Sequence, residues 1–459
     1  MGFPSRGSPC ERKYDPPCES WLPPRATALR DEGAGPGTRA GRGAGVSAHH
    51  RETQVARMRP NRAVWRPSPL SRVACAHPAR RGCRCGTVGR RHEAPGMSSD
   101  VAETKDGVVL LDYAQLVAGA DLSAAIERAY GHDGIGLLVV RGIPGLAELR
   151  DNLLPLGFRF AALPTEVKDR YVHARSSYSF GWSHGKELLR PGQFDEFKGS
   201  YYNNPQYDVP HTDAELIEKH PENYHPNVWP DADFPELRPA FMALGQRMVD
   251  VGVLVAGQCD KYVQAKLGSR LAPDAALAKT IRDSRTCKAR LLYYFAINED
   301  ATPRTRDSWC GWHSDHGSLT ALCPAMYFEA EPGAAEPARK DIPVPDPEAG
   351  LYVRTRSGEE RKVVIPKDSL AFQIGESSQI VTGGLLRSTP HAVQALAHPA
   401  SRNISRATFA VFMQPDNDMH LRPPEGVDPA EQKVGAFQPG MTFGDFAKAT
   451  FAKFYNPYA

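Results

Sequence analysis

The sequence predicts an α+β protein in which a partly helical N-terminal region packs on a β-rich C-terminal core. Three observations lead to this prediction. Before residue 287 the chain mixes strand-length apolar runs with stretches of helical periodicity. After residue 287, short β-like runs follow one another with turns between them, which is typical of a sandwich or barrel. The first 96 residues have no sustained apolar periodicity and predict a disordered arm.

Ordered elements are expected from about residue 107. The run GVVLLDY (107–113) is strand-like, and residues 122–130 have helical spacing. Residues 136–141 (GLLVVR) form an apolar run of strand length, which a Gly-Ile-Pro-Gly turn ends. Helical periodicity returns over 146–171, with a break at Leu163-Pro164-Thr165. These elements precede the β core.

A long amphipathic helix is expected over 235–267, with Pro235 near its first turn. The β core after it consists of short runs: ARLLYYF, SLTALC, GLYVRT, RKVVIP, LAFQIG and TFAVFMQ. Residues 329–350 interrupt these runs and are rich in proline, alanine and acidic residues. We expect them to form an exposed insertion.

The charge is distributed unevenly along the chain. Residues 1–96 contain 18 Lys and Arg against 7 Asp and Glu, while the remainder contains 38 against 46 and so has a net charge of −8. A segment this rich in Arg, Pro and Gly buries too little apolar surface to offset its chain entropy. We therefore expect a basic arm at 1–96, an N-terminal domain at 97–230, and a long helix with the β core at 231–459.

Three explanations of the arm stay open. An Arg-rich segment is typical of an organelle transit sequence, although Glu11, Asp15 and Glu19 are acidic where such sequences avoid acids. A nucleic-acid-binding arm would need interleaved aromatic residues, which are missing. In the third explanation, the arm is upstream sequence that belongs only to this gene model, and Met97 is the natural start.

The composition is that of a soluble protein, with 41% hydrophobic and 24% charged residues. No run of 18 apolar residues predicts a membrane span. The four cysteines after residue 97 suggest neither a disulfide framework nor a zinc knuckle. We expect a monomer without nucleic-acid or membrane partners in the reduced cytoplasm, or in a mitochondrion or plastid if the arm is a transit segment.

The motif GWHSDHGSLT (311–320) is the strongest candidate for metal chemistry. Side chains two apart on a strand point to the same face, so His313 and Asp315 are expected to converge while His316 points away. Two histidines and one carboxylate on one face, with open positions, form the non-haem Fe(II) site. The missing histidine must come from another strand.

Another match to His-x-Asp/Glu, at His211 and Asp213, has a simpler explanation. In HTDAELIEKH, Thr212 is expected to cap a helix and Glu215 to complete a capping box. Asp213 would then lie in the first turn, where the helix dipole favours an acid. A third match, His50 and Glu52, lies in the arm.

Downstream, His391 begins an apolar run after a strand and a Gly-Gly turn. Arg406 and Thr408 lie two apart on the run SRATFAVFMQP and are expected to share a face. A guanidinium beside a hydroxyl suits a carboxylate ligand.

Together these stretches resemble a known family. GWHSDHGSLT, QIGESSQIVTGGLLRSTPHAV and RATFAVFMQP are similar to motifs of the 2-oxoglutarate- and Fe(II)-dependent dioxygenases, in their isopenicillin N synthase-like branch. The likeness covers residues 107 to 455 and leaves out the arm. It implies a double-stranded β-helix, or jelly roll, with helices packed outside.

The resemblance also implies a site. By position, His313, Asp315 and His391 correspond to the iron ligands, and Arg406 and Thr408 to the pair that binds a carboxylate, usually that of 2-oxoglutarate. Tyr294 corresponds to a further co-substrate residue. Leu292 departs from the family, in which many members have asparagine. The implied cofactors are Fe(II), 2-oxoglutarate and O2.

The expected function is therefore an oxygenase that hydroxylates or desaturates a small organic substrate. One alternative is an Fe(II) oxidase of the isopenicillin N synthase type, which uses the Arg-x-Ser/Thr pair to hold its substrate and needs no 2-oxoglutarate. The other is a jelly-roll binding protein without catalytic activity.

Overall fold

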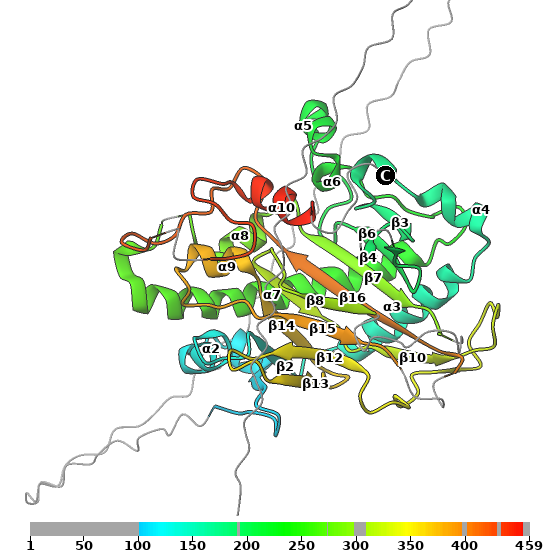
Figure 1. The fold of residues 1–459 in the computed structure, drawn as a ribbon, viewed down its shortest axis with the longest axis horizontal. Helices are drawn as coiled ribbons and strands as arrows, with labels where there is room; N and C mark the ends of the chain where they lie inside the picture. Colours follow the sequence, from blue (N-terminus) through cyan, green and yellow to red (C-terminus); the bar gives the residue numbers. More distant parts are fainter. Residues whose placement is uncertain are drawn as a thin grey trace, which may run out of the picture. The chain divides into compact units, whose positions relative to one another are not determined.

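The computed structural model describes residues 101–190, 193–272, 274–297, 309–396, 402–428 and 433–452. The arm predicted for residues 1–96 lies outside this part of the chain. The described strands form a ten-stranded sheet, a four-stranded sheet and a two-stranded pair, β4 (Leu188–Arg190) with β5 (Gln193–Phe194) (Figure 1).

The large sheet contains strands from both halves of the chain. These are β1 (Val109–Asp112), β2 (Leu137–Arg141), β3 (Gly181–His184), β6 (Lys198–Asn203), β7 (Lys288–Tyr294), β9 (Leu319–Leu322), β10 (Met326–Glu329), β11 (Arg339–Lys340), β14 (Leu370–Ile374) and β16 (Ile404–Met413). Their order is β1-β2-β14-β9-β16-β7-β6-β3, with β10 paired to β16 and β11 to β10. The predicted N-terminal part therefore shares a sheet with the predicted core.

The small sheet is antiparallel. Its strands are β8 (Cys310–His313), β12 (Gly350–Arg354), β13 (Glu360–Val363) and β15 (His391–Gln394), in the order β13-β12-β15-β8. The two sheets together are the jelly roll that the resemblance implied.

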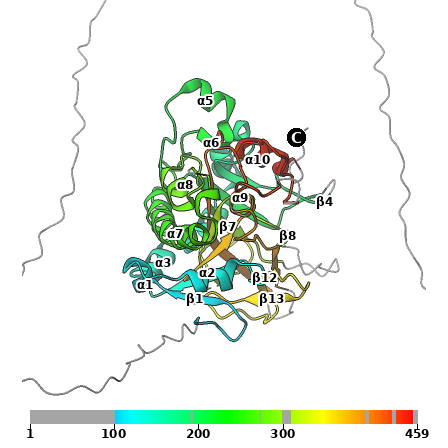
Figure 2. The ribbon, with the colours of Figure 1, turned by 90° about the vertical axis from the view of Figure 1, so that its left-hand side faces the viewer.

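The described helices are α1 (Tyr113–Val117), α2 (Ser123–Tyr130), α3 (Leu146–Ala161), α4 (Thr165–Lys168), α5 (Ala214–Lys219), α6 (Pro221–Tyr224), α7 (Leu237–Leu267), α8 (Leu277–Asp283), α9 (Glu376–Val381) and α10 (Phe443–Phe451), with 3-10 turns η1 (Asp169–Tyr171), η2 (Ala174–Ser176) and η3 (Gly268–Arg270). The helices α2, α3 and α7 pack against strands of the large sheet. Figure 2 shows the long helix α7 end-on beside the sheet, next to α3 and α8.

Two glycines let α7 approach the sheet closely. A Cβ at Gly245 would lie 2.7 Å from Cβ of Pro205, and one at Gly252 would lie 2.4 Å from Sδ of Met413 on β16. Among the described helices, the stretch Leu237–Arg270 alone is long and apolar enough to cross a membrane, and half of its apolar window is buried inside the fold. A core helix passes this test, and the buried residues of α7 belong to the core.

The core has two parts, one on each side of the large sheet. The outer cluster lies between the large sheet and the helices and includes Phe241 of α7 with Phe409 and Val411 of β16. The inner cluster lies on the opposite face and includes Leu292, Tyr294 and Val393. Because side chains alternate along a strand, the even-numbered residues of β16 face the inner side.

Most predicted elements lie within a few residues of their expected positions, including the helix predicted over 235–267. One prediction was wrong in detail. Asp213, not Thr212, caps α5, and its carboxylate accepts hydrogen bonds from the backbone N–H groups of Glu215 and Leu216. The insertion over 329–350 is largely exposed, although Asp346 and Ala349 are buried.

Replacing Phe409 by alanine should destabilise the fold strongly. Phe409 is 0% exposed, and its ring meets that of Phe241 edge-on at 4.9 Å between centroids. Because removing a buried ring leaves a cavity, we expect the free energy of unfolding in urea to fall by about 3–5 kcal/mol. Val117→Ala, at a side chain 59% exposed, should change it by less than about 0.5 kcal/mol. Equal effects of the two changes would contradict the assigned core.

Candidate metal centre

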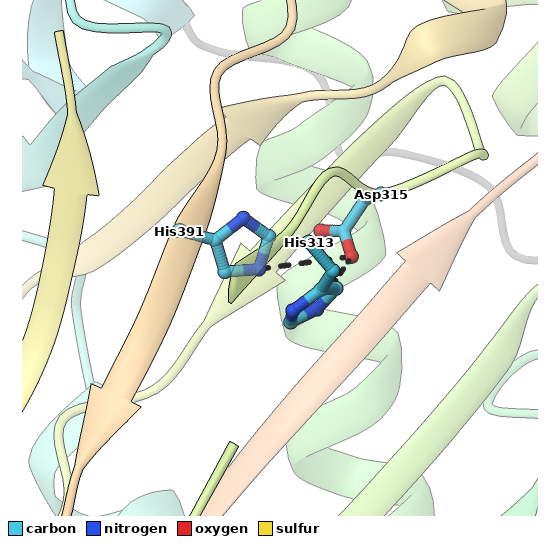
Figure 3. A group of neighbouring side chains, drawn as sticks. All are labelled: His313, Asp315 and His391. Carbon is cyan, nitrogen blue, oxygen red and sulfur yellow. Dashed lines mark ion pairs between the residues drawn. The ribbon is translucent and has the colours of Figure 1, made fainter. Parts of the chain in front are cut away.

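The structure brings His313, Asp315 and His391 together. One ligand atom from each lies within 4.8 Å of the other two. Nε2 of His313 is 3.7 Å and Nε2 of His391 is 3.8 Å from the same oxygen, Oδ1 of Asp315 (Figure 3). The figure shows the three side chains pointing toward one another from different segments. Two imidazoles and one carboxylate converging on a point are the donor set of a facial non-haem iron site.

Strand pairing places the two histidines, and a loop places the aspartate. His391 on β15 lies directly opposite His313 on β8. Strand β8 ends at His313, so the expected strand alternation does not carry Asp315 to the site. Instead, the loop after β8 is bonded to the start of α9, because the backbone N–H of Glu376 donates to the carbonyl of Asp315 at 2.7 Å. A Cβ at Gly375 would lie 2.0 Å from the carbonyl oxygen of Gly317, so only glycine fits there.

A hydrogen bond fixes the orientation of the His313 ring. Its Nδ1 lies 2.8 Å from the carbonyl oxygen of Gly311. Since a carbonyl only accepts, Nδ1 carries a proton, which leaves Nε2 as the nitrogen that a metal would bind in place of its proton. Metal-binding histidines usually have such a partner on the second nitrogen.

The electrostatics suit a cation. Burial lowers the pKa of His391 to about 4, so its ring is neutral and able to bind metal. Burial opposes ionisation of Asp315, but His391 and His313 outweigh it and hold the pKa of its carboxyl below the ordinary value. Burial also opposes a charge on His313, yet Cys310, Asp315 and the Gly311 carbonyl raise its pKa to about 9. The site thus stabilises a positive charge, which a divalent ion in place of the proton would supply. The three residues fit an Fe(II) ion.

The other two aromatic residues of the motif point elsewhere. His316 stacks on Phe443 of α10 at 5.7 Å between ring centroids and meets Phe451 edge-on at 4.8 Å. Its expected position away from the metal cluster is what the structure shows. The guanidinium carbon of Arg354 lies over the Trp312 ring, 4.0 Å from the ring centroid.

Arg406, Thr408 and Tyr294 lie together on the inner face of the large sheet. Arg406 is directly opposite Tyr294 on the neighbouring strand β7, and its guanidinium carbon lies 4.9 Å from the centre of the Tyr294 ring. Arg406 is buried, yet its Nε and Nη1 have no hydrogen-bond partner among the described residues. A buried cation without a counterion is costly. The arrangement is therefore prepared for an anion.

Thr408 and Tyr294 differ in whether their hydroxyl protons are free to bind a co-substrate. The Thr408 hydroxyl donates to the carbonyl of Cys323 at 2.8 Å, so its proton is already engaged. Burial raises the pKa of Tyr294, which keeps the phenol protonated as a donor. Leu292 packs in the inner cluster.

Sequence reasoning missed Trp309 and Cys310. Trp309 is fully buried, and its ring lies 5.0 Å from that of Tyr294 and 5.8 Å from the guanidinium carbon of Arg406. Cys310 Sγ lies 3.8 Å from Nδ1 of His313. The only signal for Trp309 and Cys310 in the sequence was their position just before the motif GWHSDHGSLT.

Comparison with known families identifies the N-terminal region. Residues 108–232 match the family model described as the non-haem dioxygenase in morphine synthesis N-terminal domain. A comparison with curated proteins finds no match.

Solved structures share the fold. A protein from Caulobacter crescentus assigned to the 2OG-Fe(II) oxygenase family is 21% identical with a TM-score of 0.54, over 75% of this chain and 99% of that one. A full-length Neurospora crassa protein in complex with alpha-KG is 19% identical with a TM-score of 0.53, over 77% and 98%. The same Neurospora crassa protein with alpha-KG and 5-formyluracil is 18% identical with a TM-score of 0.52, over 76% and 98%.

These findings define the class of the protein. Its fold is that of the 2-oxoglutarate/Fe(II)-dependent dioxygenase superfamily, and its residues 108–232 carry the N-terminal domain of non-haem dioxygenases. The resemblance predicted from the motifs agrees with the family model over residues 108–232 and with the fold of these solved structures. The alpha-KG in the Neurospora crassa protein is the co-substrate that the motifs implied.

Proposed function

We propose that this protein is a non-haem Fe(II), 2-oxoglutarate-dependent oxygenase that hydroxylates or desaturates a small organic molecule. One observation carries the proposal: the fold holds both a converging His-Asp-His set and a buried arginine without a counterion among the described residues. The first suits a divalent metal and the second suits a carboxylate. An oxygenase of this class needs both.

In this proposal His313, Asp315 and His391 hold the iron. Bound iron would supply oxygen activation and redox chemistry that no side chain provides. Arg406 would bind the distal carboxylate of 2-oxoglutarate through its unpaired Nε and Nη1. Tyr294 would donate its phenol proton to the co-substrate. Thr408 would add a third contact if its hydroxyl turned from the Cys323 carbonyl.

The surroundings of Arg406 strengthen this contact. Trp309 lies 5.8 Å from the guanidinium carbon of Arg406, and Leu292 is paired with Thr408 on the neighbouring strand. Because both are buried in the inner cluster, they would keep water from the space beside Arg406. Since charge-assisted hydrogen bonds are stronger in a poorly hydrated site, a carboxylate there would be held firmly. The same exclusion of water would protect a reactive oxidant from wasteful side reactions.

The neighbours suggest the size of the substrate. The Neurospora crassa protein is crystallised with thymine and with 5-formyluracil, which are small planar molecules. We extend to this chain only that the substrate is a small organic molecule.

Iron-dependent conversion of 2-oxoglutarate is the direct test. The full chain should bind Fe(II) under nitrogen and then 2-oxoglutarate, and in air it should release succinate, measured by NMR, faster when a metabolite extract is added. Oxygen uptake with the extract that is unchanged when 2-oxoglutarate is omitted would instead support the oxidase. Failure of the anaerobic protein to bind Fe(II) in calorimetry would support the non-catalytic binding protein.

A further inference from the structure

Gln373 is a buried carboxamide that lacks hydrogen-bond partners. Its side chain is 0% exposed, and neither Nε2 nor Oε1 meets a partner among the described residues. Nearly all buried polar groups in proteins are bonded to protein atoms or to ordered water, so an exception of this kind points to a missing partner. The location of Gln373 indicates which partner this is.

The strand β14 directs Gln373 toward the space between the sheets. Leu370, Phe372 and Ile374 belong to the outer cluster, whereas Ala371 belongs to the inner one. Alternation therefore turns Gln373 inward. Its direct neighbour on β9 is Thr320.

Backbone hydrogen bonds connect this position to the metal cluster. The backbone N–H of Glu376, three residues after Gln373, donates to the carbonyl of Asp315 at 2.7 Å. Just past Gln373, the backbone N–H of Gly375 donates to the carbonyl of Ser318 at 3.0 Å. The end of β14 and the Asp315 loop therefore form one hydrogen-bonded unit, with Gln373 beside it.

Other unpaired atoms lie on segments that neighbour the end of β14. Oδ2 of Asp315, the oxygen that does not face the histidines, is buried without a hydrogen-bond partner among the described residues, and so is Nδ1 of His391. The segment before His391 also lies near the strand next to Gln373. The side chain of Thr389, two residues before His391, packs on Gly136, where an added Cβ would lie 2.3 Å from the Thr389 hydroxyl oxygen. Leu137, which follows Gly136, is paired with Gln373.

The unpaired atoms are complementary. Nε2 of Gln373 is a donor, and Oδ2 of Asp315 is an acceptor. Oε1 of Gln373 is an acceptor, and Nδ1 of His391 is a donor when Nε2 of His391 holds a metal. A buried polar space of this kind suits an ordered water that completes the bonds. Ligands of protein-bound metals are commonly oriented by such partners.

We propose that Gln373 is a positioning residue of the metal centre, whose carboxamide hydrogen-bonds, directly or through an ordered water, to Asp315 and His391 and so orients both ligands. This inference rests on the proposed function, since it takes these residues as metal ligands. Gln373 itself would touch neither the metal nor the substrate.

Methionine at position 373 separates this role from a structural one. It has nearly the same length and volume as glutamine but no polar nitrogen or oxygen in its side chain. Because methionine fills the same space and leaves no cavity, the metal-free Gln373→Met variant should remain folded, and its urea midpoint measures any change in stability separately from metal binding. Loss of the partner of two ligands should nevertheless weaken metal binding by about 10- to 100-fold.

Gln258→Met is the matched control. Gln258 is a buried glutamine on α7 whose Nε2 donates to the carbonyl of Ala120 at 2.9 Å and whose Oε1 accepts from the backbone N–H of Leu122 at 3.2 Å. Its replacement breaks two bonds away from the metal cluster. This variant should unfold at a lower urea concentration and bind metal normally.

The experiment is a titration of the full-length metal-free chain and both variants with Co(II), followed by calorimetry and by the visible absorption of the bound ion. We expect a dissociation constant about 10- to 100-fold higher and an altered absorption spectrum for Gln373→Met alone. Gln373→Leu should behave in the same way and serves if the methionine variant does not fold.

Wild-type Co(II) affinity and spectrum in either variant at position 373 would overturn the inference while leaving the proposed function standing. A parallel loss in Gln258→Met would also overturn it, because the effect would then follow stability. Failure of the unmodified chain to bind Co(II) would contradict the proposed function and, with it, this inference.

Discussion

Replacing His313 by alanine is expected to abolish metal binding and the conversion of 2-oxoglutarate to succinate. Nε2 of His313 is one of three ligand atoms within 4.8 Å of one another, and two remaining donors hold a divalent ion poorly. Removing a mere neighbour of a ligand already weakens metal affinity by about 10- to 100-fold, so loss of a ligand should exceed about 100-fold. Calorimetry with Fe(II) under nitrogen measures the affinity, and NMR measures succinate.

His211→Ala provides the control for this prediction. His211 and Asp213 have the same spacing as His313 and Asp315, but Asp213 caps α5 and accepts two backbone hydrogen bonds. This variant should retain both metal binding and turnover. Turnover that survives His313→Ala would remove the basis for the metal assignment.

The second large effect is expected for Arg406. Arg406→Met should weaken the binding of 2-oxoglutarate to the iron-loaded protein by about 100-fold, which corresponds to about 3 kcal/mol. The physical reason is that a carboxylate would lose a buried, charge-assisted partner in a space that Trp309 and Leu292 shield from water. Anaerobic calorimetry with 2-oxoglutarate measures this loss directly.

Two further variants sharpen the prediction. Arg406→Lys keeps the charge but not the planar fork, so it should recover only part of the affinity. Arg354→Met removes a guanidinium that lies over Trp312 and pairs with Glu360, and it should leave 2-oxoglutarate binding unchanged. If Arg406→Met binds 2-oxoglutarate as well as the unmodified chain but loses affinity for substrate, Arg406 holds the substrate, as the oxidase alternative requires.

Much of the fold was predictable because its elements are local patterns. The long helix near 235–267 is visible as a period of 3.6 residues, and the strands of the core as short apolar runs between turns. Which strands pair is not a local property. The sequence alone did not reveal that β1, β2, β3 and β6 would enter the same sheet as the strands of the core.

The metal cluster shows the same division more sharply. Spacing predicted that His313 and Asp315 would converge, yet the stated reason, alternation along one strand, fails because β8 ends at His313. The carboxylate is brought into place by backbone hydrogen bonds between its loop and the segment after β14. Resemblance, not spacing, indicated His391.

The sequence by itself indicated the fold, the three candidate ligands and the Arg406 and Thr408 pair, because residue type and order carry that information. Only the tertiary structure decided that Nε and Nη1 of the buried Arg406 have no hydrogen-bond partner among the described residues, that the Thr408 proton is engaged by Cys323, and that Gln373 is paired with Thr320 at the end of β14. Burial and hydrogen-bond satisfaction depend on which distant segments meet, and no local pattern in a chain encodes that.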